Sequence, residues 1–372
     1  MIVLIFIFSI CNALFFIALR IQWDSINAVT LDTEDGSLPI VCVIIAVRNE
    51  SKNIKNLLSD LKNQHYPSSL IEIIVVNDHS ADDTKEVVTS FGLINLEWMD
   101  LRAGEEGKKK AITVGVNKAM GAYVLCTDGD CRVKPNWIRA MISPMLKGKK
   151  MVTGPVQFSG RGFFADLQSM EFIGLIGFGA ATLEMGYPSM CNGANIGYDR
   201  KVFFEVDGYS GNEHIPTGDD EFLLQKVNAR YPGSASFVKT TEAIVSTKPK
   251  ETVHEFISQR IRWVSKWRFH KSRFVKLSAI LAFLDFMLAM SLPGLLFGAH
   301  TWVSILLLLA RVLGTFSYLH GISNFFGQRL DFFNMVILVI FYPYYSFVLG
   351  FASIFGKYSW KGRSYRNDGQ GI

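Results

Sequence analysis

Residues 123–131 read YVLCTDGDC, an apolar run that ends in two aspartates separated by one glycine. The run Tyr123–Cys126 is predicted to be a buried strand, because continuous apolar residues are typical of strands covered on both faces. Asp128 and Asp130 stand at i and i+2, so in extended backbone their carboxylates point to the same side. Such a pair can share one divalent cation, although an Asx-type turn at a strand end would also explain it.

Two further apolar runs, Ile40–Val47 and Ile71–Val76, precede this strand and are rich in valine and isoleucine. Helix-like periodicity follows at Lys52–Asn63 and at Lys108–Met120, and Pro135 stands at a position typical of a first helical turn. This alternation predicts an α/β protein with right-handed connections and a parallel sheet. In such sheets ligands bind at the carboxyl ends of the strands.

Polar residues follow the first two of these strands, in Val47-Arg48-Asn49-Glu50 and in Asn77-Asp78-His79-Ser80. Polar groups at the end of a buried strand can bind a nucleotide, and Asp78 could accept a hydrogen bond from a uracil-type imide or a ribose hydroxyl. The alternative is that Asp78, Ser80 and Asp82 cap the next helix. Both interpretations stay open at this point.

A second acidic cluster, Thr217-Gly218-Asp219-Asp220-Glu221, precedes the apolar run Phe222-Leu223-Leu224. Acidic residues at a helix N-terminus complement the helix dipole, which accounts for at least two of the three carboxylates. If the reaction transfers a group to a hydroxyl, one carboxylate must accept the hydroxyl proton. Asp220 is our candidate for that base.

The composition, 49% hydrophobic and 19% charged, is apolar for a soluble enzyme, and the excess lies at the two ends of the chain. Ile2–Leu19 carries no charge and is long enough to span a bilayer. A signal peptide is disfavoured, because no basic stretch precedes this run and no small-residue cleavage site follows it. The basic residues lie downstream of this run, so the positive-inside rule places the residues after Arg20 in the cytoplasm.

The net charge of +5 suits a membrane-proximal protein and does not require a nucleic-acid partner. The five cysteines form no C-x-x-C pair, and we expect four of them to be reduced and buried, as in a cytoplasmic domain.

Three further hydrophobic stretches lie in the last third, at about Leu277–Phe297, Trp302–Leu319 and Phe332–Phe355. Glu251–Lys276, just before them, mixes aromatic and basic residues, which predicts an amphipathic helix in the membrane interface. Three full spans would place the basic tail outside the cell, against the positive-inside rule. We therefore expect a cytoplasmic tail, with one stretch re-entrant or interfacial.

Gln259, Arg262 and Trp263 stand at i, i+3 and i+4 of this helix and share one face. An amide, a guanidinium and an indole suit a pyrophosphate together with a sugar or lipid headgroup. An interfacial belt of arginine and tryptophan is the alternative. Elsewhere, Gly177-x-Gly179 lacks a preceding strand, so helix packing by small residues is favoured over a dinucleotide site.

The order of the motifs resembles that of the family 2 glycosyltransferases over roughly Pro39–Trp263. The matching elements are Asn49-Glu50, Asn77-Asp78, Gly107-Lys108, TDGDC at 127–131, CNGAN at 191–195, GDD at 218–220 and QRIRW at 259–263. The last of these matches the family's QxxRW element. The resemblance implies a GT-A fold, which is a Rossmann-like, mostly parallel sheet flanked by helices. It also implies a nucleotide-sugar donor, most often UDP-linked, with Mg²⁺ or Mn²⁺ and inversion at the anomeric carbon.

The resemblance further implies roles for individual residues. Because Gly-Asp-Asp replaces the family's common Glu-Asp pair, Asp219 is a second choice for the base beside Asp220. Asp130 and Asp128 would hold the metal. The donor site would comprise Val47, Asn49, Glu50, Asp78, Lys108, Asp128, Gly129 and Asp130, whereas Gly193 and Asn195 would border the sugar and Gln259, Arg262 and Trp263 would close over the diphosphate and acceptor.

The expected organisation is an N-terminal transmembrane anchor (1–22), a cytoplasmic catalytic domain (38–250), an interfacial helix (251–276), two to three C-terminal transmembrane segments (277–356) and a basic tail (357–372). This small membrane portion resembles that of lipid-glycosylating members. The expected function is transfer of one sugar to a hydroxyl of a membrane lipid or lipid-linked glycan in cell-envelope synthesis, at the cytoplasmic face of a bacterial inner membrane. The alternatives are a processive polysaccharide synthase, a nucleotidyltransferase and a non-catalytic membrane scaffold.

Overall fold

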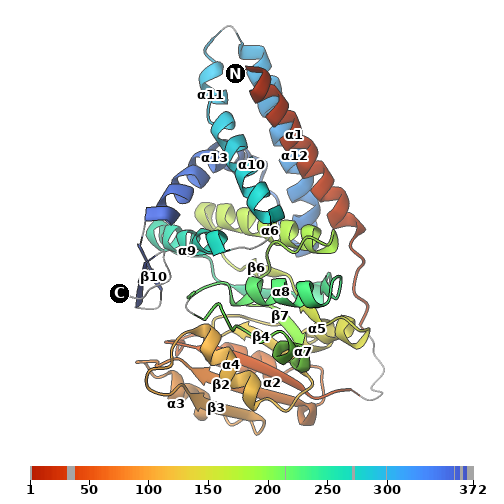
Figure 1. Cartoon of the computed structure of the whole chain (residues 1–372), viewed down its shortest axis with the longest axis vertical. Helices are drawn as coiled ribbons and strands as arrows, with labels where there is room; N and C mark the ends of the chain where they lie inside the picture. Colours follow the sequence, from red (N-terminus) through yellow and green to blue (C-terminus); the bar gives the residue numbers. More distant parts are fainter. Residues whose placement is uncertain are drawn as a thin grey trace. The chain divides into compact units, whose positions relative to one another are not determined.

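The computed structural model describes residues 2–31, 38–213, 215–269, 273–298, 300–355, 357–360 and 363–366. The chain divides into two compact units, and Figure 1 labels many of their elements. The first unit comprises Met1–Ser25, Gly160–Ala181 and Pro249–Ile372, and the second comprises Ile26–Ser159 and Thr182–Lys248.

The second unit is built on a seven-stranded sheet with the strand order β3-β2-β1-β4-β7-β5-β8. Its strands are β1 (Val41–Val47), β2 (Ile71–Asn77), β3 (Leu96–Asp100), β4 (Tyr123–Asp128), β5 (Met151–Thr153), β7 (Ile196–Asp199) and β8 (Ala235–Phe237). A separate parallel pair is formed by β6 (Val156–Phe158) and β9 (Val245–Thr247). The three predicted strands are therefore confirmed as β1, β2 and β4.

The sheet is mostly parallel, as predicted. β1 lies between β2 and β4 and runs parallel to both, and β3 runs parallel to β2. Only β7, among the described strands of this sheet, is antiparallel to its neighbours β4 and β5. Burial explains the order, because every residue of β1 except Ala46 is buried, whereas β3 at the edge is half-exposed.

Helices flank the sheet, and Figure 1 shows α4 beside β2. α4 packs on β1 and β2, and α5 packs on β4, β5 and β7. The helix predicted from Pro135 begins two residues later, at Trp137. The helices of this unit are α2 (Ile54–Lys62), α3 (Thr84–Thr89), α4 (Lys108–Lys118), α5 (Trp137–Leu146), α7 (Arg200–Glu205) and α8 (Asp219–Arg230).

The first unit consists mainly of long apolar helices. They are α1 (Ile2–Ser25), α6 (Phe163–Glu184, which ends in the second unit), α9 (Val253–Ser265), α10 (Arg273–Ala289), α11 (Leu292–Leu295), α12 (Thr301–Phe326) and α13 (Phe332–Phe355). Four stretches among the described residues are long and apolar enough to cross a membrane: Ile2–Ser25, Lys276–Leu295, Thr301–Phe326 and Phe332–Ser353. In Figure 1, α6 and α9 run crosswise to α1 and α12.

Within 251–276, predicted to form one interfacial helix, the structure has α9, a 3-10 helix at Lys266–Phe269 and the start of α10. Of the predicted tail, Lys357–Trp360 and Arg363–Arg366 form the antiparallel strands β10 and β11. Residues 361–362 and 367–372 lie outside the described residues.

The cysteines are free, and three of them, Cys42, Cys126 and Cys131, are buried. Cys191 is half-buried and Cys11 is exposed on α1. Burial of four cysteines was expected, so Cys191 departs from that expectation because it lies in a loop next to the polar site rather than in a strand.

A buried ion pair joins two of the candidate membrane helices. Arg311 of α12 donates from Nη1 and Nη2 to the two carboxylate oxygens of Asp285 of α10, at 2.7 Å each. Asn12 of α1 donates to the same carboxylate at 3.0 Å. The charge of Arg311, which lies within the hydrophobic stretch Trp302–Leu319, is therefore neutralised by a neighbouring helix, as expected for ionisable groups in an apolar environment.

Small residues allow α6 and α12 to pack closely. A Cβ added at Gly177 would lie 2.1 Å from Cδ1 of Ile322, and one at Gly174 would lie 3.2 Å from Cδ2 of Leu319. The prediction of helix packing by small residues is confirmed at Gly177.

The α1–α12 contact provides a test of this packing. A Cβ at Gly314 would lie 2.8 Å from the backbone Cα of Ala13, which cannot move aside as a side chain could. We expect Gly314→Leu to lower the free energy of unfolding by about 1–3 kcal/mol, because overpacking forces the two helices apart. Thermal unfolding in detergent measures the effect. Gly350→Leu is the matched control, since nothing lies within 4 Å of a Cβ at Gly350 of α13, and an equal loss there would contradict the packing argument.

Candidate active site

The carboxyl ends of β1, β2 and β4 lie side by side. Val47 is in register with Asn77 on β2, and Ala46 is in register with Asp128 on β4. The three polar segments that follow these strands therefore meet at one edge of the sheet. This is the edge at which α/β proteins bind their ligands.

The loops after β1 and β2 are joined by hydrogen bonds. The backbone N–H of Asp78 donates to the Val47 carbonyl at 2.8 Å, that of Asn49 donates to Ser80 Oγ at 2.9 Å, and that of Ala81 donates to Asn49 Oδ1 at 2.8 Å. Asn49 adopts a left-handed conformation with φ of 55°, and so does His79 with φ of 54°. Backbone of this kind is uncommon outside glycine and is often held at functional sites.

Asp82 supports this pair of loops. Its carboxylate accepts hydrogen bonds from the backbone N–H groups of Ser51, at 3.1 Å, and of Thr84, at 3.2 Å. Burial alone would raise the pKa of Asp82, but the hydrogen bonds from Ser51 and Thr84 lower it below its usual value. Glu50 donates its backbone N–H to Thr84 Oγ1 at 2.8 Å. The capping alternative thus describes Asp82, which accepts from the Thr84 N–H at the start of α3. Ser80 instead accepts from Asn49, and Asp78 is 3% exposed at the carboxyl edge of the sheet.

Lys108, at the first position of α4, lies between two carboxylates of different segments. Its Nζ is 2.7 Å from Oδ1 of Asp128 and 3.3 Å from Oδ2 of Asp219. Burial would lower the pKa of the ammonium, but Asp128, Asp219 and then Asp220 raise it well above its usual value. Lys108 is therefore a fixed positive charge in this site at neutral pH.

Asp220 is held by two backbone groups. Its Oδ2 accepts a hydrogen bond from the N–H of Gly193 at 2.8 Å, and its Oδ1 accepts one from the N–H of Glu221, also at 2.8 Å. A Cβ at Gly193 would lie 2.9 Å from Asp219 Oδ2 and 3.1 Å from Lys108 Nζ. A side chain here would therefore displace the charged groups of Asp219 and Lys108 from their present positions.

Asn195 has no exposed surface. Its amide accepts a hydrogen bond from Trp137 Nε1 at 3.0 Å and donates to the carbonyls of Pro155 and Ala243 at 2.8 Å each. These bonds join α5 to the segments beside β6 and β9. A sugar contact through Asn195 stays a prediction, and its side chain has a clear structural role.

Asp128 and Asp130 supply oxygen ligands of the type that Mg²⁺ and Mn²⁺ prefer. Gly129 between them is closely packed, since its Cβ would lie 3.1 Å from Glu50 Cγ and 3.2 Å from Val47 Cγ1. Across the residues that the structure describes, no three His, Cys, Asp or Glu side chains are arranged to enclose a metal ion. A metal at this position would therefore need oxygen ligands from the substrate and from water.

Lys109 and Tyr209 are site residues that sequence analysis missed. Lys109 is 6% exposed, and its Nζ donates to the carbonyls of Asn212, at 2.7 Å, and Ile215, at 2.9 Å, which anchors the loop before Gly218. The Tyr209 hydroxyl is buried without a hydrogen-bond partner within the described part of the chain. Burial, and next the charge of Asp219, raise the pKa of this phenol well above its usual value. Lys109 stands between two other lysines, at 108 and 110, so its burial could not be predicted from the sequence.

Gln259, Arg262 and Trp263 lie on α9, in the first unit. Gln259 Oε1 accepts a hydrogen bond from Arg260 Nη1 at 2.6 Å, and the Trp263 ring stacks on Phe172 of α6 with 5.7 Å between centroids. The strand-end residues, Lys108, Gly193 and the Gly218–Asp220 segment all belong to the second unit.

Comparison with known proteins identifies the class of fold first. The structure superimposes on a mannosyltransferase, PcManGT from Pyrobaculum calidifontis, solved in complex with GDP-Man and Mn²⁺, with a TM-score of 0.60 and 15% identity over 87% of this chain and all of that one. This likeness shows the fold, an α/β sheet of the GT-A type flanked by helices.

The sequence then points to a family. Residues 42–206 match the family described as Glycosyl transferase family 2. Glycosyltransferase AglE of Haloferax volcanii is 35% identical over 127 residues, 33% of this chain and 41% of that protein. Poly-beta-1,6-N-acetyl-D-glucosamine synthase of Staphylococcus epidermidis is 27% identical over 155 residues, 41% of this chain and 37% of that protein. The matches thus span about two fifths of each relative, and they support a family 2 glycosyltransferase domain.

Proposed function

We propose that this protein is a membrane-bound, inverting glycosyltransferase. It transfers one sugar from a nucleotide-sugar, UDP-linked as in most of the family, to a hydroxyl of a lipid or lipid-linked glycan at the cytoplasmic face of a bacterial inner membrane. The observation that carries this proposal is the bridge that Lys108 makes between Asp128 and Asp219 at the carboxyl edge of the sheet. Lys108 joins Asp128, at the end of β4, to Asp219, at the start of α8. The proposed reaction needs such an arrangement, because the donor site must lie beside the catalytic base.

In the proposed reaction, the acceptor hydroxyl oxygen attacks the anomeric carbon from the face opposite the diphosphate. Its proton passes to the Asp220 carboxylate, and the bond between the anomeric carbon and the diphosphate oxygen breaks. The nucleoside diphosphate leaves with the electron pair of that bond. Asp220 is suited to the role of base because two backbone N–H groups fix its orientation.

The leaving diphosphate gains negative charge, which the site must compensate. A divalent cation held by Asp130 and Asp128 would supply most of this compensation, as in metal-assisted transfer generally. Lys108 adds a fixed positive charge beside Asp128. Asp78, Asn49 and Glu50 would bind the nucleoside at the joined strand-end loops.

Membranes that contain the protein, incubated with labelled UDP-sugars and a lipid extract, test this function. We expect a labelled, lipid-extractable product that is lost when EDTA removes the divalent cation and returns when Mg²⁺ or Mn²⁺ is added. Membranes without the protein provide the baseline. No transfer from any of the UDP-sugars would contradict the proposal and favour a non-catalytic scaffold.

A processive polysaccharide synthase is the second candidate. The similarity to poly-beta-1,6-N-acetyl-D-glucosamine synthase and the presence of four candidate membrane spans favour it. Product length separates the two candidates. A single added sugar supports the leading proposal, whereas a ladder of increasing length supports the synthase.

A further inference from the structure

Arg260, inside the QRIRW segment but outside the QxxRW positions, has a buried charge. Its side chain is almost completely covered, with 2% exposed, and it lies in the first unit together with its partners. Nε and Nη2 both donate to Oε2 of Glu171 on α6, at 3.0 and 2.7 Å. Glu171 is itself 7% exposed. A buried ion pair of this kind must be matched closely in geometry to offset its desolvation.

The guanidinium of Arg260 also contacts two aromatic rings of its own helix. It lies 4.4 Å from the ring centroid of Phe256 and 4.3 Å from that of Trp263. Its third nitrogen, Nη1, donates to Gln259 Oε1. Arg260 therefore holds the side chains of two of the three QxxRW residues.

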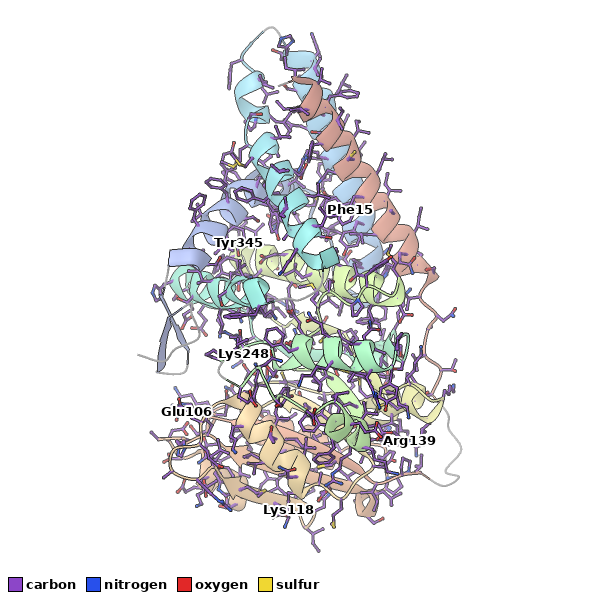
Figure 2. The ribbon with its side chains drawn as sticks, in the orientation of Figure 1. Phe15, Glu106, Lys118, Arg139, Lys248 and Tyr345 are labelled. Carbon is purple, nitrogen blue, oxygen red and sulfur yellow. The ribbon has the colours of Figure 1, made fainter. Side chains whose placement is uncertain are left out.

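Glu171 connects this cluster to a candidate membrane helix. Tyr345 of α13, labelled in Figure 2, donates its hydroxyl to Glu171 Oε1 at 3.3 Å. The ring of Tyr345 stacks on Phe256 with 5.6 Å between centroids. The apolar residues Ile261 of α9 and Leu349 of α13 pack together beside this contact. One carboxylate of α6 thus joins α9 to α13.

Helical geometry gives this cluster a consequence for Arg262. An α-helix turns by about 100° per residue, so the side chain of Arg262 is separated from that of Arg260 by about 160° around the helix, whereas Trp263 is separated from it by about 60°. With Arg260 fixed toward α6, the rotation of α9 about its axis is set. Trp263 is then directed to Phe172 of α6, and Arg262 projects from the side of α9 about 100° around the helix from Trp263.

We infer that Glu171 is a positioning residue of the transferase. Through Arg260 it sets the rotation of α9, anchors Gln259 and Trp263, and turns Arg262, the motif's proposed binding group for the diphosphate, away from the Arg260–Glu171 pair. This inference rests on the proposed function, because it assigns Glu171 to the reaction that the QxxRW segment serves.

The test is Glu171→Gln in the full-length protein in detergent, since glutamine keeps the shape and removes the charge. Hydrogen exchange of residues 253–265 should accelerate by about tenfold or more, because α9 loses its buried anchor. The kcat for sugar transfer should fall about 10- to 100-fold, as expected from misplaced groups, with the donor KM changed by less than about threefold. Arg260→Gln should lower kcat similarly and add little in the Glu171→Gln background.

Asp285→Asn is the matched control, because it breaks a second buried carboxylate–arginine pair of the first unit, between α10 and α12. It should leave the exchange of α9 and kcat close to those of the wild type. Equal effects of Asp285→Asn would overturn the inference in favour of general destabilisation. Unchanged exchange and normal transfer in Glu171→Gln would overturn it as well. Absence of transfer by the wild type would instead overturn the proposed function, and exchange of α9 would still show whether Glu171 orders that helix.

Discussion

Asp220→Asn should severely reduce sugar transfer while leaving nucleotide binding intact. Removing the carboxylate that accepts the proton of the acceptor hydroxyl should lower kcat by about 100- to 10,000-fold. Asparagine keeps one oxygen, so it can retain one of the two backbone hydrogen bonds that Asp220 accepts from Gly193 and Glu221. The loop at Gly193 should therefore stay in place. Transfer of labelled sugar measures kcat, and calorimetry with UDP measures nucleotide affinity.

Asp219→Asn is the comparison variant. Asp219 pairs with Lys108 at 3.3 Å and stands one residue before Asp220, so its loss should weaken the charge balance of the site without removing the base. We expect a smaller fall in kcat than for Asp220→Asn. Reversal of this order would assign the base to Asp219, and normal transfer by both variants would refute a base in this segment.

Lys108→Gln should be the second severe substitution. It removes the ammonium between Asp128 and Asp219, and the two carboxylates are then left to repel each other and the diphosphate. We expect kcat/KM to fall about 100- to 1,000-fold, the usual effect of losing one charge-stabilising donor. The raised pKa keeps Lys108 protonated in the wild type, so the deficit should be uniform from about pH 6 to pH 9.

Lys110→Gln is the matched control for Lys108→Gln, in the same helix and two residues away. Lys110 pairs with Glu105 at 3.0 Å on the surface, where its side chain is 44% exposed. Exposed pairs contribute little, so activity should change by less than about twofold. If Lys110→Gln were as inactive as Lys108→Gln, a general loss of positive charge would explain both variants and the bridge would not.

Much of the fold was predictable because burial shows directly in the sequence. β1, β2 and β4 are rich in valine, isoleucine and leucine, as is typical of strands covered on both faces. β3, Leu96–Asp100, was missed because it is a half-exposed edge strand with mixed residues. The antiparallel direction of β7 was not predicted, because the direction of a strand depends on its connections and local composition does not record them.

The candidate site was only partly predictable, for a related reason. Residues that follow strands can be located once the strands are known, so Asp78, Asp128 and Asp130 could be placed at one edge of the sheet. Which partner each side chain selects depends on segments distant in the chain. The resemblance implied that Asn195 borders the sugar, and nothing in the sequence indicated that its amide joins Trp137, Pro155 and Ala243 in the interior.

The sequence by itself therefore determined the parallel core, the ends of its strands and the apolar helices, because these follow from local patterns of burial and charge. Only the tertiary structure showed that Lys108 bridges Asp128 and Asp219, and that Arg260 is paired with Glu171. Both arrangements bring together residues from separate segments, and their geometry is set by packing rather than by spacing. Identical neighbouring residues, such as the three lysines at 108–110, acquire different contacts and roles only in the folded chain.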